Sequence, residues 1–175
     1  MTIEERAAKA VEMKTSGMYN CAQSVAVALA DETKLSDEQL CQLTAGFCAG
    51  MGNMEATCGA LIGAGMITGL KTEGKGTLAK TRQIQEEFGR RCGAIKCRDL
   101  KTVTDGKPLC PCEECVRNAV MVYGEVVLGD GVSGPFFKFI LQFPFDEYIL
   151  LKSIVLTIYI LISFRSYLCQ ESPEF

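Results

Sequence analysis

The sequence predicts an all-α protein, a small bundle of about five to six helices followed by an atypical hydrophobic C-terminal tail. Apolar residues recur at helical spacing behind capping residues, and no convincing alternating strand pattern occurs before residue 129. The length of 175 residues and the hydrophobic content of 48% suit one domain with a real core. Any chemistry is therefore expected on helices and on the short glycine-rich loops between them.

Capping residues predict where the first three helices begin. Thr2 and Glu5 form a capping box, and Ser36 and Gln39 form another. Asn20 can cap the helix between these two. The predicted helices run from Ile3 to about Ser16, from Cys21 to about Ala30, and onward from Ser36 with Leu40, Leu43 and Phe47 facing inward.

The next predicted helix is glycine-rich and central. The run from Cys58 to Leu70 is apolar on every side, as expected of a helix in the middle of a small bundle. Gly59 and Gly63 lie one turn apart, which lets another backbone approach closely. The run of about thirteen residues is too short to span a bilayer. We also assign Gly59 and Gly63 to the predicted cofactor-binding set.

Two more helices complete the body. The first runs from Thr77 to Phe88 and is amphipathic through Leu78, Ile84 and Phe88. The last begins near Cys112, and its apolar face carries Val116, Ala119, Val120 and Tyr123.

Composition changes abruptly near Gly129. Residues 1–128 hold fifteen alanines, and residues 129–175 hold none. The segment from Gly129 to Pro135 is rich in turn residues and cannot continue a helix. We therefore predict a cysteine-rich helical domain over residues 1–128 and a separate tail over residues 129–175.

The tail contains one long apolar segment. Residues 148–168 are interrupted only by Lys152 and Arg165, and their length suits a bilayer. The change in composition equally suits a non-native extension, and packing against the body or a partner is a third alternative. Membrane association through residues 148–168 is therefore one of three open interpretations.

Residue counts exclude several classes of function. The chain has no histidine, which rules out Ser-His-Asp and Cys-His nucleophile systems and histidine-ligated zinc or haem within the chain. A net charge of −3 offers no electrostatic footprint for nucleic acid. The first fourteen residues are charged throughout and lack a signal-peptide core, so we expect a cytoplasmic protein, tethered to a membrane only if the tail is native.

The ten cysteines are the most informative feature. In a cytosolic protein, such cysteines are more often metal-binding or catalytic than disulfide-bonded. A set of buried thiols that only pack as small hydrophobic groups is the alternative.

Four cysteines stand at or near predicted helix starts. A helix N-terminus favours the thiolate, which is both the nucleophile and the metal ligand. These candidate catalytic residues and metal ligands are Cys21, Cys58, Cys97 and Cys115.

Two local clusters extend the set of candidate metal ligands. Cys110, Cys112 and Cys115 form a CxCxxC run, and Cys92 and Cys97 form a pair upstream of it. Closely spaced thiols are compatible with zinc, with an iron–sulfur cluster or with thiol–disulfide exchange. Alternatively, Cys110 and Cys112 are exposed loop thiols without a joint role.

Several short motifs occur together in a characteristic order. They are Asn20-Cys21-Ala22-Gln23-Ser24, Gly50-Met51-Gly52, Thr57-Cys58-Gly59-Ala60-Leu61-Ile62-Gly63, Phe88-Gly89, Cys97-Arg98-Asp99-Leu100 and Cys115-Val116. With them the chain resembles the C_GCAxxG_C_C family of redox-active proteins over roughly residues 1–128. The resemblance implies a small helical protein with four characteristic cysteines, matched here by Cys21, Cys58, Cys97 and Cys115. A related helical region of split-Soret cytochromes holds an iron–sulfur centre, which implies a metal site here too.

The sequence therefore predicts a redox-active protein that uses clustered thiolates, either an oxidoreductase or an electron carrier. It transfers electrons through a bound iron–sulfur or other metal centre, or it exchanges thiols and disulfides. The alternative is a non-enzymatic structural zinc or metal-binding module, or an adaptor. The expected cofactor is an iron–sulfur cluster, with zinc or no cofactor as alternatives. The expected partners are an unidentified redox protein and a second copy of the chain.

Overall fold

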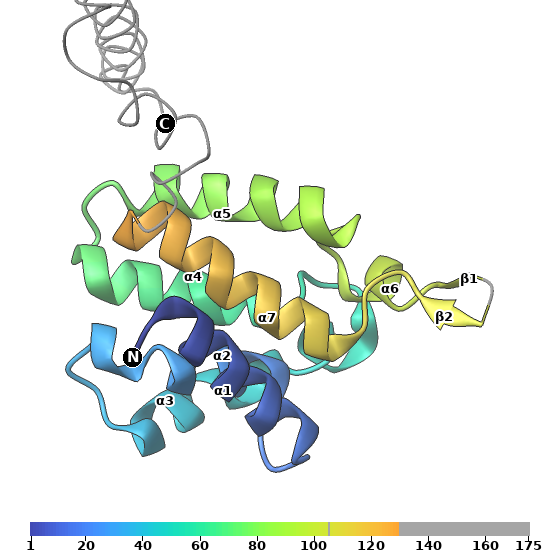
Figure 1. Ribbon diagram of the computed structural model, residues 1–175, viewed down its shortest axis with the longest axis horizontal. Coiled ribbons are helices and arrows are strands. Elements are labelled where there is room, and N and C mark those ends of the chain that lie inside the picture. The colour runs from blue at the N-terminus through green and yellow to red at the C-terminus, as the bar shows by residue number, and fades with distance from the viewer. Residues whose placement is uncertain (105, 130–175) are drawn as a thin grey trace, which may run out of the picture. The chain divides into compact units, whose positions relative to one another are not determined.

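The computed structural model describes residues 1–104 and 106–129 (Figure 1). Within them the chain forms seven α-helices and one short antiparallel strand pair, so the predicted all-α class is confirmed. The first compact unit of the chain is Met1–Gly131. The tail predictions, including the membrane segment at residues 148–168, lie outside the described residues.

The helices follow one another through short turns. Their bounds are α1 Ile3–Thr15, α2 Cys21–Ala28, α3 Asp37–Thr44, α4 Gly59–Thr72, α5 Thr77–Cys92, α6 Cys97–Leu100 and α7 Cys112–Tyr123. The strand pair is β1 Val103–Thr104 with β2 Lys107–Pro108. Single helical turns occupy Ala30–Glu32, Ala45–Phe47, Gly50–Met54 and Gly124–Leu128.

Helices α4 and α7 form the centre of this unit. Helix α7 packs against α1, α2, α4 and α5, and α4 packs against α2, α5 and α7 (Figure 1). Their inward faces are fully buried at Ile67, Val116, Val120 and Tyr123, and Phe88 of the neighbouring helix α5 is fully buried as well. The predicted glycine-rich helix is central, and it shares that position with α7.

The N-terminal caps form as the sequence predicts. Thr2 and Glu5 exchange hydrogen bonds at the start of α1, and Ser36 and Gln39 do so at the start of α3. Asn20 caps α2, where it pairs reciprocally with Gln23. These caps satisfy N–H groups that would otherwise lack partners at a helix start, which explains why local sequence locates the three helices so closely.

Close contact between α4 and α2 depends on two glycines. A Cβ atom at Gly63 would lie 2.7 Å from the carbonyl oxygen of Ala22. A Cβ atom at Gly59 would lie 2.3 Å from the carbonyl oxygen of Phe47. The space beside both glycines is therefore filled by neighbouring backbone, as expected from their spacing of one turn. Their assignment to the cofactor-binding set stays a prediction.

Three details differ from the sequence-based expectations. Leu43 of α3 is 51% exposed and Leu78 of α5 is 75% exposed, so neither faces the core. The side chains that α3 buries are Leu40 and Thr44, because α3 packs mainly on α2 and the turn after it. The strand pair was also not expected, since two-residue strands are too short to show alternation.

A partly buried ion network ties the N-terminal helices to α4. Arg6 donates to Asp31 at 2.8 Å and to Glu32 at 2.6 Å, and Lys71 pairs with Glu32 at 2.8 Å. The side chain of Glu32 is only 9% exposed. These contacts link α1, the turn after α2 and the end of α4.

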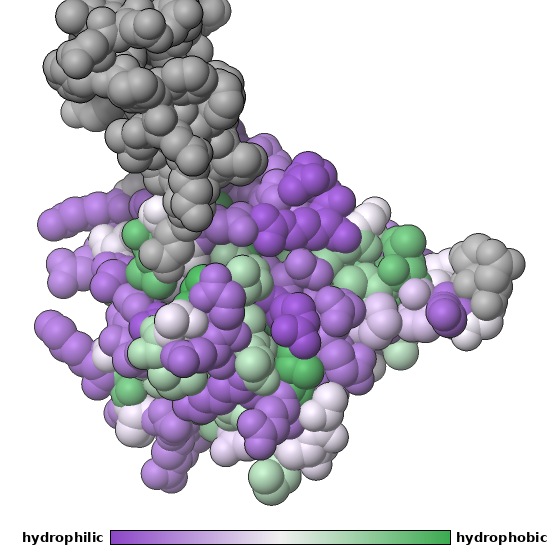
Figure 2. Space-filling model, in the orientation of Figure 1, coloured by the Kyte–Doolittle hydropathy of each residue, from purple (hydrophilic) through white to green (hydrophobic). Residues whose placement is uncertain are grey.

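The surface shown in Figure 2 is mostly hydrophilic, with small separate hydrophobic patches. Among the helices of the described residues, none combines the length and the apolar character needed to cross a bilayer.

Candidate thiol site

Backbone pairing places Cys58 beside Cys97. The N–H of Cys58 donates to the carbonyl oxygen of Ile95 at 2.8 Å, and the N–H of Cys97 donates to Ala56 at 3.1 Å. These two bonds join the residues just before α4 and α6 in antiparallel fashion. The two helices therefore start next to each other, each with a cysteine at its first turn.

The contact between α4 and α2 brings Cys21 to the same place. A Cβ atom at Gly59 would lie 3.5 Å from the amide nitrogen of Ala22, so the starts of the two helices are adjacent. Cys21 is the first residue of α2, and Cys58 precedes the first residue of α4. Gly59 and Gly63 therefore help to bring Cys21 and Cys58 together.

The strand pair returns the chain to the end of α6. The N–H of Leu109 donates to Thr102 at 3.0 Å, and the N–H of Cys110 donates to Leu100 at 3.0 Å. Helix α7 then begins at Cys112 and carries Cys115 in its first turn. The short strand pair between α6 and α7 therefore brings the CxCxxC run to the other cysteines.

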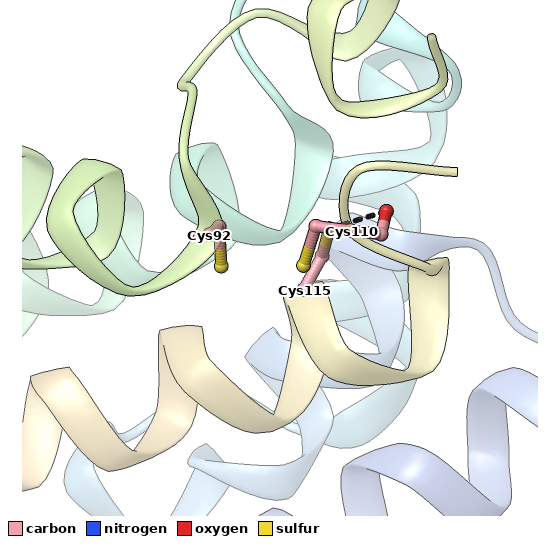
Figure 3. Close-up of side chains that lie close together, drawn as sticks. All are labelled: Cys92, Cys110 and Cys115. Atoms are coloured by element: carbon pink, nitrogen blue, oxygen red, sulfur yellow. Dashed lines mark hydrogen bonds between the residues drawn. The ribbon is translucent and has the colours of Figure 1, made fainter. Parts of the chain in front are cut away.

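Three buried thiols form the tightest group, which we call the thiol triad. It consists of Cys92 at the end of α5, Cys110 after β2 and Cys115 in α7 (Figure 3). Their Sγ atoms all lie within 4.8 Å of one another. The thiol of Cys115 also donates a hydrogen bond to the carbonyl oxygen of Cys110, at 3.6 Å.

Further thiol contacts join the triad to the other candidates. Cys115 interacts with Cys58 as well as with Cys92, and Cys21 interacts with Cys112, and these interactions shift the pKa of the thiols. We call the whole set the thiol cluster: Cys21, Cys58, Cys92, Cys97, Cys110, Cys112 and Cys115. Six of these residues are buried and Cys112 is half-buried, which makes Cys112 the most accessible sulfur of the cluster.

The two other described cysteines differ from the cluster. Cys48 is exposed, and Cys41 is half-buried on α3. Cys169 lies outside the described residues.

Lys101 is a residue of the site that the sequence analysis missed. Its ammonium group donates to the carbonyl oxygen of Cys110 at 2.8 Å and lies 3.9 Å from Sγ of Cys115. Burial lowers the pKa of Lys101, but charge interactions with Cys115 and Cys112 outweigh it, so the net pKa is raised. In the sequence, Lys101 stands only four residues after Cys97, which is a weak indication of a role at the site. The other thiols come close to Lys101 only because the strand pair places Cys110 next to the end of α6.

The Cys112 thiol is the one whose pKa is lowered, to about 5, among the described cysteines with a resolved shift. The main cause is a hydrogen bond donated by Cys21, and the positive charge of Lys101 adds to it against the effect of burial. Cys112 is also the first residue of α7, where the helix dipole favours a negative charge. A half-buried thiolate at this place is a competent nucleophile.

The sequence predicts that a position at a helix start lowers the pKa of a cysteine. In the structure the pKa is instead raised at all four cysteines predicted from this argument, Cys21, Cys58, Cys97 and Cys115. Hydrogen bonding to Cys112 and burial raise the pKa of Cys21, and hydrogen bonding to Cys115 and burial raise that of Cys58. Burial raises the pKa of Cys97. The hydrogen bond from Cys58 lowers the pKa of Cys115, but the bond with Cys92 and burial outweigh it, so the net pKa is raised. Interactions between neighbouring thiols, together with burial, thus outweigh the helix dipole at these positions.

The two arginines beside Cys92 are engaged elsewhere. Arg90 and Arg91 both pair with Glu87, and Arg91 also pairs with Glu125 of the turn that follows α7. These ion pairs hold α5 against the turn that follows α7, whereas Lys101 contacts the triad at Cys110 and Cys115.

The donor chemistry of the thiol cluster suits thiophilic metals. Thiolate ligands select zinc, copper(I) and iron–sulfur clusters, and the triad supplies three sulfurs at one point. Cys58, at the start of α4, interacts with Cys115 and is a candidate for a fourth ligand, although its sulfur is not one of the three that lie within 4.8 Å of one another. The described residues therefore contain a group of cysteines that could hold a metal, with no identity assigned to that metal.

Comparison with known proteins gives one match. Residues 19–126 match a protein family described as "Putative redox-active protein (C_GCAxxG_C_C)". No curated protein and no solved structure matches the chain. The matched range begins just before Cys21 and ends after α7, so it contains the entire thiol cluster.

Proposed function

Because the chain belongs to the C_GCAxxG_C_C family, we propose that it is a thiol redox protein that works by dithiol–disulfide exchange. The observation that supports this most directly is the pairing of half-buried Cys112 with buried Cys21, whose interaction lowers the pKa of Cys112 and raises that of Cys21. The half-buried Cys112 is accessible to a reaction partner, and the buried Cys21 is available to react with Cys112 afterwards. This is the arrangement that an exchange reaction requires of an attacking and a resolving thiol.

The exchange has two steps. The Cys112 thiolate attacks one sulfur of a partner disulfide, forming a mixed disulfide and releasing the first partner thiolate. Cys21 then loses its proton and attacks Sγ of Cys112, which forms the Cys21–Cys112 disulfide and releases the second partner thiolate. Two electrons pass from the two cysteines to the partner, and protons from solvent complete the partner thiols. The partner is therefore a disulfide-bearing protein or small molecule.

The test is to oxidise the reduced, metal-free full chain with a small disulfide and to map its disulfides by mass spectrometry. We expect a Cys21–Cys112 disulfide to appear first. Cys21→Ser should trap the mixed disulfide on Cys112, and Cys112→Ser should slow the first step by at least tenfold. Cys48→Ser is the matched control, because Cys48 is exposed and lies outside the cluster. A first disulfide that excludes Cys112 would overturn the proposal.

A second candidate is an electron carrier with an iron–sulfur centre, and the thiol triad favours it. Three buried thiols from different elements are a donor set that such centres use. Anaerobic purification followed by an absorption spectrum and metal analysis would test it. A brown protein with bound iron and sulfide supports the carrier, and a colourless protein without iron excludes it.

A further inference from the structure

We propose that the thiol triad, completed by Cys58, binds a single tetrahedral thiophilic ion of the zinc class. Two of its members, Cys92 and Cys110, are additional to the four cysteines that match the family pattern. The family pattern alone therefore does not define this site. The proposal does not depend on exchange at Cys21 and Cys112, because neither residue is a ligand.

The spacing of the sulfurs favours one ion over a 4Fe–4S cluster. A tetrahedral ion with metal–sulfur bonds of about 2.3 Å holds its ligands about 3.8 Å apart. The three Sγ atoms already lie within 4.8 Å of one another, close to that separation. A 4Fe–4S cluster attaches each of its four thiolates to a different iron atom, so its thiolate sulfurs lie farther apart, with inorganic atoms between them.

The ligands are held from different directions. Cys92 ends α5, Cys110 is tied to Leu100 by its backbone N–H, and Cys115 stands in the first turn of α7. Cys58 enters from the start of α4 and interacts with Cys115. Ligands from four separate segments can surround an ion, whereas ligands on one segment approach it from one side. The ion would thereby tie together the ends of α5, α6 and α7.

The charge of the proposed site and the protons released on binding can both be accounted for. Four thiolates and one divalent cation carry a net charge of −2, and Lys101, at 3.9 Å from Sγ of Cys115, offsets part of it. Each ligand that is protonated in the free protein gives its proton to solvent on binding, including the one that Cys115 donates to the carbonyl of Cys110. No electron transfer is involved, so no oxidant or reductant is needed.

The test is a cobalt(II) titration of the reduced, metal-free full chain without oxygen. Tetrahedral thiolate coordination gives strong visible absorption, which we expect to saturate at one equivalent and to disappear on adding zinc. Cys92→Ser and Cys110→Ser should each weaken binding by tenfold or more. Cys58→Ser should weaken it and change the shape of the absorption, because oxygen would replace one sulfur.

Two sets of controls make the outcome decisive. Cys41→Ser and Cys48→Ser should leave the titration unchanged, since both residues lie outside the cluster. Cys21→Ser and Cys112→Ser should also keep full cobalt binding, even though they remove exchange. Zinc should raise the thermal midpoint of the native sequence but not of Cys110→Ser, whose substitution lies in a loop. Unchanged cobalt binding in Cys92→Ser or Cys110→Ser would overturn the proposal.

Discussion

At the scale of single residues, Lys101 sets the charge of the thiol cluster. Its ammonium group contacts the Cys110 carbonyl and lies near Sγ of Cys115, and its charge helps to lower the pKa of Cys112. A cation at this distance from buried sulfurs favours every ionised state that the cluster adopts. The consequence can be measured at Cys112, the most accessible sulfur of the cluster.

We expect Lys101→Met to raise the pKa of Cys112 by about one unit, because methionine keeps the apolar stem and removes the charge. The measurement is the rate of alkylation of Cys112 against pH in the metal-free protein, read by mass spectrometry. Its midpoint should move upward from about 5. Lys107→Met in β2 serves as the control for losing one positive charge. An unchanged midpoint in Lys101→Met would show that Lys101 does not stabilise the Cys112 thiolate.

The pKa of Glu32 depends on its ion-pair partners Arg6 and Lys71. Burial raises its pKa, but hydrogen bonds and charge from Lys71 and Arg6 outweigh this effect, so the net pKa is lowered in the folded state. A lowered folded pKa adds stability above the unfolded value of about 4.3, and that stability is lost as the pH falls toward the folded pKa. Glu32 should therefore contribute to acid unfolding.

We expect Glu32→Gln to reduce the free energy of unfolding at pH 7 by about 1–3 kcal/mol, because two charge-assisted hydrogen bonds are weakened. The variant should also lose less stability than the native sequence as the pH falls from about 5 to 3. Urea unfolding at several pH values measures both effects. Glu38→Gln, an exposed residue without an ion pair among the described residues, is the control. Parallel pH profiles for Glu32→Gln and the native sequence would contradict the assignment.

At the scale of elements, the contact between α4 and α2 determines where the cysteines meet. Gly63 faces the backbone of Ala22, and Gly59 faces the backbone of Phe47 and Ala22. Any side chain at either position would separate the helix that begins beside Cys58 from the helix that begins with Cys21. The glycines therefore act on the site through packing.

We expect Gly63→Ala to destabilise the protein by about 1–3 kcal/mol, and Gly63→Leu to do so by more, because both force α4 away from α2. Gly65→Ala is a matched control on the same helix. Its Cβ would lie 3.6 Å from the Thr81 side chain, an ordinary contact, so the variant should gain about 0.5–1 kcal/mol from helix propensity. Thermal and urea unfolding compare the three. A melt that Gly63→Leu leaves unchanged would mean that this face of α4 is exposed.

At the scale of the whole molecule, the described part contains the thiol cluster and a continuous core. Fifteen alanines lie before residue 129 and none after it, which indicates that the two parts were not shaped by one packing constraint. Each motif that matches the family lies within residues 19–126. The boundary near Gly129 is a prediction that deletion of the tail can test.

We expect a chain that ends at residue 130 to stay helical and to keep its nine thiols and its metal content. It should also aggregate less than the full chain, because the apolar run at residues 148–168 is removed. Circular dichroism, thiol counting and metal analysis of both chains provide the comparison. An unfolded or metal-free shorter chain would show that residues beyond 130 belong to the core.

The sequence by itself determined the local features of this protein. Caps at Thr2, Asn20 and Ser36 act through bonds to residues three positions away, so sequence spacing locates them directly. The apolar glycine-rich run likewise identifies α4 as central, since a helix without a polar face must be surrounded. The family pattern can also be recognised from the sequence alone, because it consists of short motifs in a fixed order.

Only the tertiary structure decided which groups meet. The sequence treats Cys92 and Cys110 as members of two separate local clusters, and their meeting with Cys115 depends on a strand pair too short to predict. Lys101 contacts the thiols for the same reason, and Leu43 faces outward because α3 packs on only one side. Such contacts join residues far apart along the chain, and they depend on the angles and distances at which helices pack. Those quantities are set by the sum of many weak contacts and leave no signal at any single position.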